Sequence, residues 1–271
     1  MSILYLINNQ IIQPITEEKE IICQCSSGNE WIVGLFTIIG VFVGALINFI
    51  YRFTEKRKII EAMTKSLFGE IASFRYLASK ELPETKSVLN KFQKMYQSQN
   101  FNYSPAITYF GEPIKDYYDL HQSNIHLLEY DLRNDVVAFY GYMKSINDVA
   151  KKLDSMFKRF YKRDKTVGGQ DVIKFLEKLI KQDEAIDLLG AEILAQLMVR
   201  YHTDEFKKTK GAGQKKRDIR NYLQNHFQIG EVINVKEVAR ITQSDLVLLN
   251  IVLLETGQFK KVKYGQYKKI I

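Results

Sequence analysis

The sequence predicts a mainly α-helical protein with an N-terminal transmembrane helix, a cytosolic antiparallel helical bundle or long-helix hairpin, and a small winged-helix-like α+β end. Three observations carry this prediction. Residues 31–53 form an unbroken apolar run, residues 54–205 show helical periodicity, and the remaining residues change to short helices and a hairpin. The expected divisions are an outer segment 1–30, a span 31–53, a helical bundle 54–205, a basic linker 206–213 and a C-terminal domain 214–271.

The composition excludes several protein classes. The chain has 271 residues, of which 46% are hydrophobic and 26% charged, and this balance excludes wholesale disorder. Its two cysteines exclude a disulfide scaffold and a multi-cysteine zinc module. Cys23 and Cys25 are too close in sequence for an easy mutual disulfide, so they are either unpaired or paired between chains.

The apolar run is long enough to cross a membrane. No charge occurs between Trp31 and Tyr51, and a helix rises about 1.5 Å per residue, so this length covers a hydrocarbon core of roughly 30 Å. The two aromatic residues at its ends suit the membrane interfaces. A secretory signal peptide fits poorly, because the run is too long and is preceded by acidic residues.

The charges beside the span predict its orientation. The preceding flank is acidic, whereas Arg52 and Lys56–Lys58 follow the span and outnumber Glu55. Positive charge favours the cytoplasmic side. We therefore expect the N-terminus outside the cell and the C-terminal region in the cytoplasm.

Small residues within the span suggest helix association. Gly40 and Gly44 form a GxxxG pattern, and Asn48 extends the same face by one turn. Such a face lets two helices approach closely and bond through the amide, which predicts a homo-oligomer. The alternative is that glycine is simply common in membrane helices.

Helical stripes dominate residues 54–205. A stripe from Ile60 to Ala78 predicts a helix that stops near Pro83, and a second helix begins near Glu84. Residues 100–113 are expected to form a loop, and Ile114–Leu128 a third, tyrosine-rich helix. A last helix is expected over Gln170–Tyr201.

The strongest periodicity in the chain predicts a coiled-coil-like helix. Apolar residues alternate at steps of four and three over four heptads, which is typical of an a/d seam. These residues are Leu132, Val136, Phe139, Met143, Ile146, Ala150, Leu153, Phe157 and Phe160.

Basic charge is concentrated at the C-terminus. Residues 54–205 contain 23 Lys and Arg against 22 Asp and Glu, whereas residues 206–271 contain 14 against 5. The whole excess of the net charge of +8 therefore lies in the C-terminal region. Such an excess suits an anionic partner.

The order of elements after residue 213 resembles the winged helix-turn-helix superfamily. Helices are expected over Lys216–Phe227, Val235–Arg240 and, capped by Ser244, Asp245–Glu255, and a hairpin follows with its turn at Tyr264 and Gly265. The closest cues to the superfamily are Val235–Arg240, Leu253–Phe259 and Tyr264–Tyr267. The third helix departs from the DNA-reading pattern, because it carries two acids and no Lys or Arg.

The basic residues lie elsewhere in this region, on the first helix, after the second helix and in the hairpin. They could hold nucleic-acid phosphates, anionic lipid headgroups or a protein partner, or form a solvated face. The candidates are Lys215, Lys216, Arg217, Arg220, Arg240, Lys260, Lys261, Lys263, Lys268 and Lys269.

No pattern in the sequence indicates catalysis. The histidines lack metal-ligand spacing, and Lys210–Lys216 lacks the leading glycine and the Ser or Thr of a phosphate-binding loop. We therefore expect no enzyme, no metal, no cofactor and no small-molecule substrate.

The middle of the chain is similar to a loosely defined set of uncharacterised bacterial single-pass membrane proteins with a helical cytosolic region. The residues that carry this resemblance are Ser104–Ile107, Ser123–Leu128 and Val136–Tyr140, within residues 30–160. The resemblance implies a bacterial inner-membrane anchor and a helical cytosolic body, and it carries no known activity or functional residues.

These observations favour a non-enzymatic membrane-anchored scaffold, sensor or regulator that oligomerises and binds an unknown partner through its basic end. One alternative is a membrane-tethered regulator that binds nucleic acid. Another is a membrane-acting abortive-infection or toxin-like effector that assembles through the GxxxG face.

Overall fold

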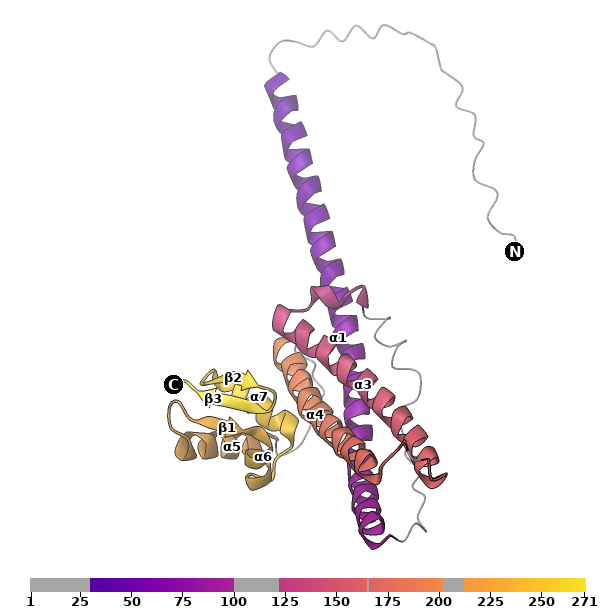
Figure 1. The fold of residues 1–271 in the computed structure, drawn as a ribbon. Helices are drawn as coiled ribbons and strands as arrows, with labels where there is room; N and C mark the ends of the chain where they lie inside the picture. Colours follow the sequence, from indigo (N-terminus) through magenta and orange to yellow (C-terminus); the bar gives the residue numbers. More distant parts are fainter. Residues whose placement is uncertain (1–29, 100–121, 165, 202–211) are drawn as a thin grey trace, which may run out of the picture. The chain divides into compact units, whose positions relative to one another are not determined.

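The computed structural model describes residues 30–99, 122–164, 166–201 and 212–271 (Figure 1). The chain divides into two compact units, Met1–Phe53 and Thr54–Ile271. The described residues are mainly helical, with six α-helices and a small antiparallel sheet of three strands near the C-terminus. The expected mainly helical chain is confirmed. The cysteines of the expected outer segment lie outside the described residues.

The first unit contains the start of helix α1, which runs over Glu30–Ser98. Of the helices described, only α1 is both long and apolar enough to cross a membrane. Its most apolar stretch has a mean hydropathy of 2.1, and none of that stretch is buried. The large apolar side chains from Leu35 to Phe53 are exposed within the chain, as lipid-facing side chains would be. The side chain of Trp31 lies outside the described residues.

Helix α1 does not stop at Pro83, so the two helices expected on either side of this residue are one. Pro83 is exposed, and so is Ser79, whose carbonyl would accept the N–H that proline lacks. Ala78 before it and Phe92 after it are buried in the same core. Tertiary packing on both sides of the proline thus maintains a helix that local sequence predicts to end.

Replacing Pro83 with alanine is expected to stabilise the protein. The change restores a backbone hydrogen bond in the middle of α1 and removes a steric clash, and its expected effect is about 1–3 kcal/mol in the free energy of unfolding. Urea unfolding of the detergent-solubilised full chain measures it, with the exposed Ser87→Ala in the same helix as control. A loss of stability in Pro83→Ala would contradict a continuous helix.

The second unit begins with a helical body, defined as α1 from Thr54 onwards together with α3 and α4. Contacts between side chains of different helices show the relative directions of these helices. Tyr140 donates a hydrogen bond to Glu70 and Phe92 packs on Phe157 with ring centroids 5.3 Å apart, so α3 runs parallel to α1. Helix α4 runs antiparallel to both. The bounds are η1 Ile125–Leu127, α3 Tyr130–Tyr161 and α4 Gly169–Tyr201.

These directions correct one part of the antiparallel helical bundle or long-helix hairpin expected from the sequence, because α4 is antiparallel to its two neighbours but α1 and α3 are parallel. A parallel pair requires the chain to return from the end of α1 to the start of α3. Most of that return lies in residues 100–121, outside the described residues, and includes most of the helix expected over Ile114–Leu128. Of the described end of that range, Gln122 is helical, and turns and the short η1 follow it.

The heptad seam of α3 is filled by its own chain. Eight of the nine seam residues belong to the core of the helical body or pack against it, and the ninth, Ala150, is also buried; Phe160 is half-buried and the others are buried. On α1, Phe92 contacts both Phe157 and Phe160, and on α4 a Cβ added at Gly190 would lie 3.2 Å from the ring of Phe139. The periodicity therefore predicted the helix and its buried face correctly, and that face is not free to associate with another copy.

The C-terminal segment, defined as residues 212–271, forms three helices and the sheet. Antiparallel pairing places β3 between β1 and β2, and Gly257, with a φ of +64°, ends α7 as expected. Asp245 caps α7 in place of the expected Ser244, because its carboxylate accepts the Val247 N–H. The bounds are α5 Ala212–His226, β1 Val232–Asn234, α6 Val235–Ile241, α7 Leu246–Thr256, β2 Phe259–Lys263 and β3 Gln266–Lys269. Most of the expected linker 206–213 lies outside the described residues, and its last two residues begin α5.

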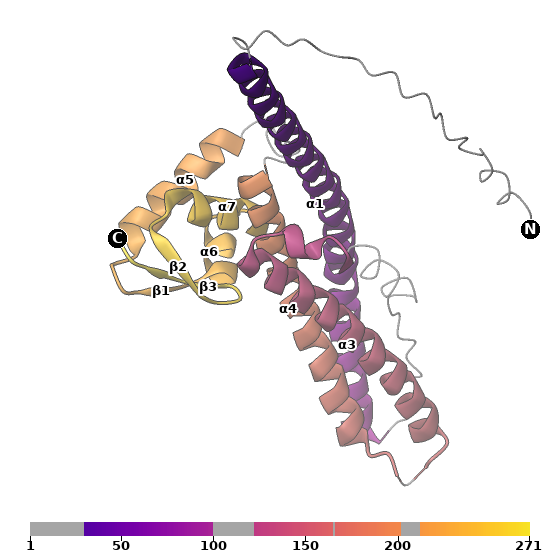
Figure 2. The same ribbon diagram turned by 90° about the horizontal axis from the view of Figure 1, so that it is seen from above.

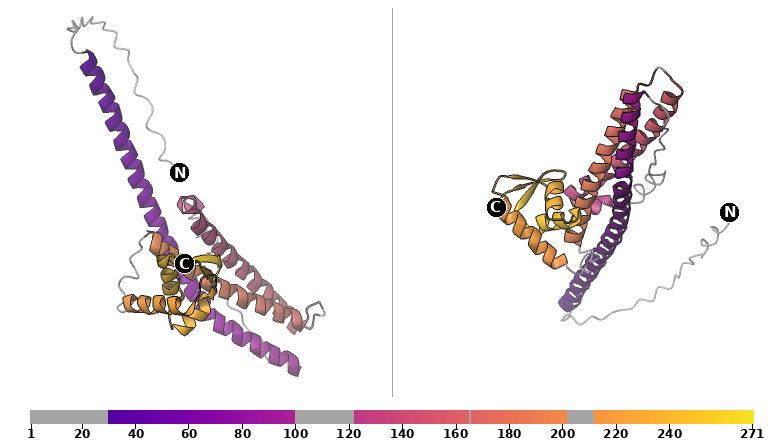
Figure 3. Two further views of the ribbon diagram at one scale, coloured as in Figure 1. Left: turned by 90° about the vertical axis from the view of Figure 1, so that its left-hand side faces the viewer. Right: turned by 90° about the horizontal axis from the view of Figure 1, so that it is seen from below.

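The C-terminal segment packs against α4 of the helical body. Figure 2 and Figure 3 show its helices and sheet gathered beside α4 in each view. The contact includes the turn between β2 and β3, where a Cβ added at Gly265 would lie 3.1 Å from both terminal methyl carbons of Leu188. This docked arrangement positions the candidate site.

Candidate functional site

Helix α7 lies between two hydrophobic cores. Leu248, Leu249, Val252 and Leu253 belong to the core of the C-terminal segment. Val247 and Ile251 belong to the core of the helical body, and Leu246 and Leu254 pack against it. A helix that is apolar on all sides is expected to be buried on all sides. The docking interface between α7, the sheet and α4 is therefore the candidate functional site.

A buried ionic cluster joins the sheet to the helical body. We call it the Lys261 cluster; it contains Lys261, Asp135, Glu192, Tyr267 and Gln196. Lys261 Nζ lies 2.7 Å from Glu192 Oε1 and 3.1 Å from Asp135 Oδ2. Gln196 Nε2 donates to Asp135 Oδ2 at 2.8 Å, and the Tyr267 hydroxyl donates to Glu192 Oε1 at 3.3 Å. One lysine from β2 thus holds a carboxylate from α3 and one from α4.

Burial decides the electrostatics of this cluster. The Glu192 side chain is 2% exposed, and desolvation raises its pKa although Lys261 opposes the shift. Desolvation lowers the pKa of Lys261, but the attraction of Glu192 and Asp135 outweighs it, so the net pKa is raised. Burial and the neighbouring Glu192 also raise the pKa of Tyr267. The surroundings therefore favour the charged form of Lys261 and the neutral forms of Glu192 and Tyr267.

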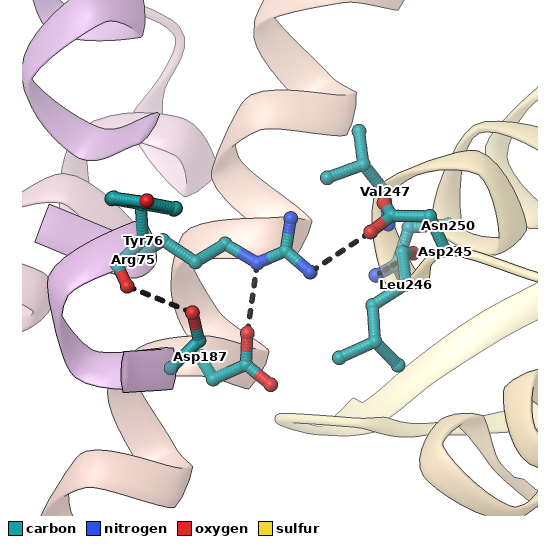
Figure 4. A network of polar contacts seen from close by, with 8 residues as sticks. Arg75, Tyr76, Asp187, Asp245, Leu246, Val247 and Asn250 are labelled. Carbon is teal, nitrogen blue, oxygen red and sulfur yellow. Dashed lines mark hydrogen bonds and ion pairs between the residues drawn. The ribbon is translucent and has the colours of Figure 1, made fainter. Parts of the chain in front are cut away.

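A second polar network ties three helices together. Figure 4 shows the Arg75 side chain reaching from α1 between Asp187 on α4 and Asp245 at the start of α7. Arg75 Nε donates to Asp187 Oδ1 at 2.8 Å, and Nη2 donates to Asp245 Oδ2 at 3.2 Å. The other oxygen of Asp245 caps α7, so the residue that starts this helix also anchors it to α1.

A third set of charges continues the interface along α4. Lys236 on α6 lies 3.8 Å from Glu184 Oε2, and Lys86 on α1 donates to Glu184 Oε1 at 2.9 Å. Next to Glu184, Asp183 is 3% exposed, and its burial beside Glu81 and Glu184 raises its pKa to about 7. The carboxylates of α4 thus face basic residues from both α1 and the C-terminal segment.

The raised pKa of Asp183 predicts a pH-dependent stability. The folded protein keeps this proton up to about pH 7, whereas the unfolded carboxyl loses it near its ordinary value of 3.8. The free energy of unfolding should therefore fall as the pH rises from about 4 to about 7 and level off above, by up to about 4 kcal/mol. Asp183→Asn should flatten this slope in urea unfolding at pH 5 and pH 8, and the exposed Glu177→Gln should not. An unchanged slope in Asp183→Asn would contradict the assignment.

The basic residues predicted from the sequence as partner contacts differ in their surroundings, since some bond within the chain and most are exposed. Lys261 lies in the buried cluster, and Lys269 is 9% exposed and donates to the Phe227 carbonyl at the end of α5. Lys216 and Arg220 lie 2.7 and 3.9 Å from the carboxylate of Glu255. Lys261 and Lys269 act within the chain and are therefore not proposed as partner contacts. The exposed members are Lys215, Arg217, Arg220, Arg240, Lys260, Lys263 and Lys268, of which Arg217 bonds to Gln214.

The membrane-helix candidates are open to a partner. Gly40, Gly44 and Asn48 all lie exposed on α1 within the first unit. No described atom would come within 4 Å of a Cβ added at Gly40 or Gly44. The surface needed for close helix approach is thus present.

Sequence reasoning missed the carboxylates and the arginine of the docking interface. A signal for them was available, because Asp135, Asp183 and Glu192 lie on or beside the apolar stripes of their helices. Buried carboxylates require a partner. The sequence did not indicate which of its many cations would supply it.

The described residues offer no group of three or more His, Cys, Asp or Glu side chains that could hold a metal. The interface instead has the chemistry of a docking surface, with an apolar helix surrounded by ion pairs. Comparison of the chain with models of protein families, with curated proteins and with solved structures finds no match.

Proposed function

We propose that this chain is a non-enzymatic, membrane-anchored scaffold or regulator whose basic C-terminal segment is a protein-docking module of the winged-helix type. The order α5–β1–α6–α7–β2–β3, with β3 central in the sheet, supports the winged-helix assignment. The apolar start of α1 supports the anchor, and the flanking charges support an outer N-terminus and a cytoplasmic C-terminal region in a bacterial inner membrane.

One observation carries the docking role: α7 is buried between two cores. In winged helices that read DNA, the equivalent third helix enters the major groove. Here its outer residues, Val247 and Ile251, pack against the helical body, and Asp245 at its start is bonded to Arg75. A helix used in this way supports recognition of protein by protein, with the helical body as the first partner.

Self-association through the span is the second part of the proposal. The open face of Gly40, Gly44 and Asn48 supports it, whereas the filled heptad seam of α3 leaves the span as the better candidate. Cross-linking in nanodiscs or in cells should trap a dimer or higher oligomer that Gly44→Leu abolishes. Persistence of the oligomer in that variant would exclude this face.

A tethered nucleic-acid-binding regulator is the second candidate function. The exposed Lys215, Arg240, Lys260, Lys263 and Lys268 favour it, since phosphate contacts need no base-reading helix.

Binding of labelled duplex DNA and single-stranded RNA by the full chain distinguishes the two functions. The chain is held in zwitterionic nanodiscs, and fluorescence anisotropy is measured at about 50 mM and about 200 mM salt. The docking role predicts no binding that survives the higher salt. Binding that survives it, and that is lost when Lys260, Lys263 and Lys268 become alanine, would establish the second candidate instead.

A further inference from the structure

The two faces of the small sheet have different surroundings. Pairing aligns Ile233 with Tyr267 and Lys261 with Tyr267, so these three residues form one row across the sheet. That row faces inward: Ile233 and Tyr267 lie in the core of the C-terminal segment, and Lys261 reaches the carboxylates of the helical body. Because side chains alternate along a strand, the adjacent row faces the opposite way.

The adjacent row belongs to an exposed surface that combines lysines with aliphatic side chains. Cross-strand pairing aligns Val232 with Lys268 and Lys268 with Lys260. Two exposed aliphatic residues adjoin this row: Val262, at the bulge between Lys261 and Lys263 of β2, and Ile270, which directly follows β3. Val232 is 50%, Val262 54% and Ile270 46% exposed, and both lysines are exposed. We call this surface, made of these five residues, the outer sheet face.

Within the described ranges, no carboxylate balances the positive charges of the two lysines of the outer sheet face. Lys260 and Lys268 are direct cross-strand partners, and like charges in that position repel each other. Neither forms an ion pair with a described carboxylate, in contrast to Lys261 between them in the sequence. An anionic partner would remove the repulsion.

The aliphatic residues of the outer sheet face indicate which class of anionic partner fits it. A nucleic-acid backbone would match the lysines but leave Val232, Val262 and Ile270 in water, and the face offers no aromatic ring or arginine for a base. A bilayer surface with anionic lipids matches both kinds of side chain, because its headgroups attract lysine and its acyl boundary accepts aliphatic groups. The chain also carries a helix apolar enough to sit in that bilayer.

We infer that the outer sheet face binds the anionic lipid surface of the membrane, an inference that rests on the proposed membrane anchor. Lys260 and Lys268 contact the headgroups, and Val232, Val262 and Ile270 enter the interface. This gives opposite roles to neighbouring residues of β2, with Lys261 docking the segment on the helical body and Lys260 contacting lipid.

Lysine footprinting of the full chain in nanodiscs tests this inference. An amine-acetylating reagent is applied in zwitterionic nanodiscs and in nanodiscs containing anionic phosphatidylglycerol, and modification is read by mass spectrometry. We expect Lys260 and Lys268 to react at least about fivefold more slowly with anionic lipid. The exposed Lys215 on α5 serves as internal reference, because α5 covers the inner side of the sheet through Ile219 and Leu223.

A matched pair of variants separates face-specific binding from a general effect of charge. Val232→Asp combined with Val262→Asp keeps both lysines and should abolish their protection. Ile241→Asp, an exposed isoleucine on α6, should retain it.

Three results would overturn the inference: equal protection in both lipids, protection of Lys215 to the same extent, or protection in zwitterionic nanodiscs on addition of duplex DNA. A chain that fails to enter nanodiscs at all would instead refute the proposed anchor, and the two failures are thus distinguishable.

Discussion

Replacing Lys261 with methionine is expected to destabilise the protein by about 3 kcal/mol. The change leaves Asp135 and Glu192, whose side chains are 9% and 2% exposed, as two neighbouring carboxylates without their cation. Breaking a buried ion pair from one side costs about 3–5 kcal/mol, and the partial exposure of Lys261 places the effect at the lower end. Urea unfolding of the detergent-solubilised full chain measures it.

The loss in Lys261→Met should depend on pH. Without the lysine, the pKa of the Glu192 carboxyl rises further, so the folded variant keeps a proton that the unfolded chain releases. A carboxyl whose pKa is raised in the folded state makes the protein less stable as the pH rises. The loss in the free energy of unfolding should therefore be larger at pH 8 than at pH 5. The neighbouring Lys260→Met, on the opposite face of the strand, should change stability by less than about 0.5 kcal/mol.

A rescue variant identifies the cause. Combining Lys261→Met with Asp135→Asn and Glu192→Gln removes the uncompensated charges and should recover most of the lost stability. If the triple variant is as unstable as Lys261→Met, the loss arises from packing and not from buried charge.

Replacing Ile251 with aspartate is expected to have an effect of at least similar size and to separate the C-terminal segment from the helical body. Ile251 is 3% exposed and belongs to the core of the helical body although it lies on α7. A carboxylate there is buried without a cation partner, so the docked state is strongly penalised.

Hydrogen exchange locates the effect of Ile251→Asp. Undocking should increase exchange in α7 and in the part of α4 that faces it, while the far end of α3 remains protected. The control is Ile241→Asp, since Ile241 is 49% exposed on α6 and the same chemical change should there cost less than about 1 kcal/mol. Unchanged exchange in α4 of Ile251→Asp would contradict docking through α7.

The sequence alone identified features that depend on one segment. The apolar run predicted a helix able to cross a membrane, and the four-three spacing predicted α3 and its buried face because both signals arise from the geometry of a single helix. The order of helices and hairpin after residue 213 was predicted for the same reason, with Gly257 and Gly265 at positions of positive φ.

Predictions from the sequence were wrong or incomplete where contacts with other segments determine the structure. Pro83 looked like a helix end, but buried residues on both sides keep α1 continuous. The apolar composition of α7 could have predicted its burial, since Leu246–Leu254 contains no charged residue. The sequence did not reveal that the covering surface is α4 of the same chain.

Lys260 and Lys261 illustrate most clearly the difference between what the sequence predicts and what only the tertiary structure decides. By composition they are equivalent members of a basic hairpin, and the sequence assigned them one role. Strand alternation separates their faces, but only the docked fold places Asp135 and Glu192, which are 57 residues apart in the sequence and lie on two different helices, around one of them. Local periodicity fixes the helices and strands, whereas pairing between distant charges depends on how those elements pack, and only the tertiary structure contains that information.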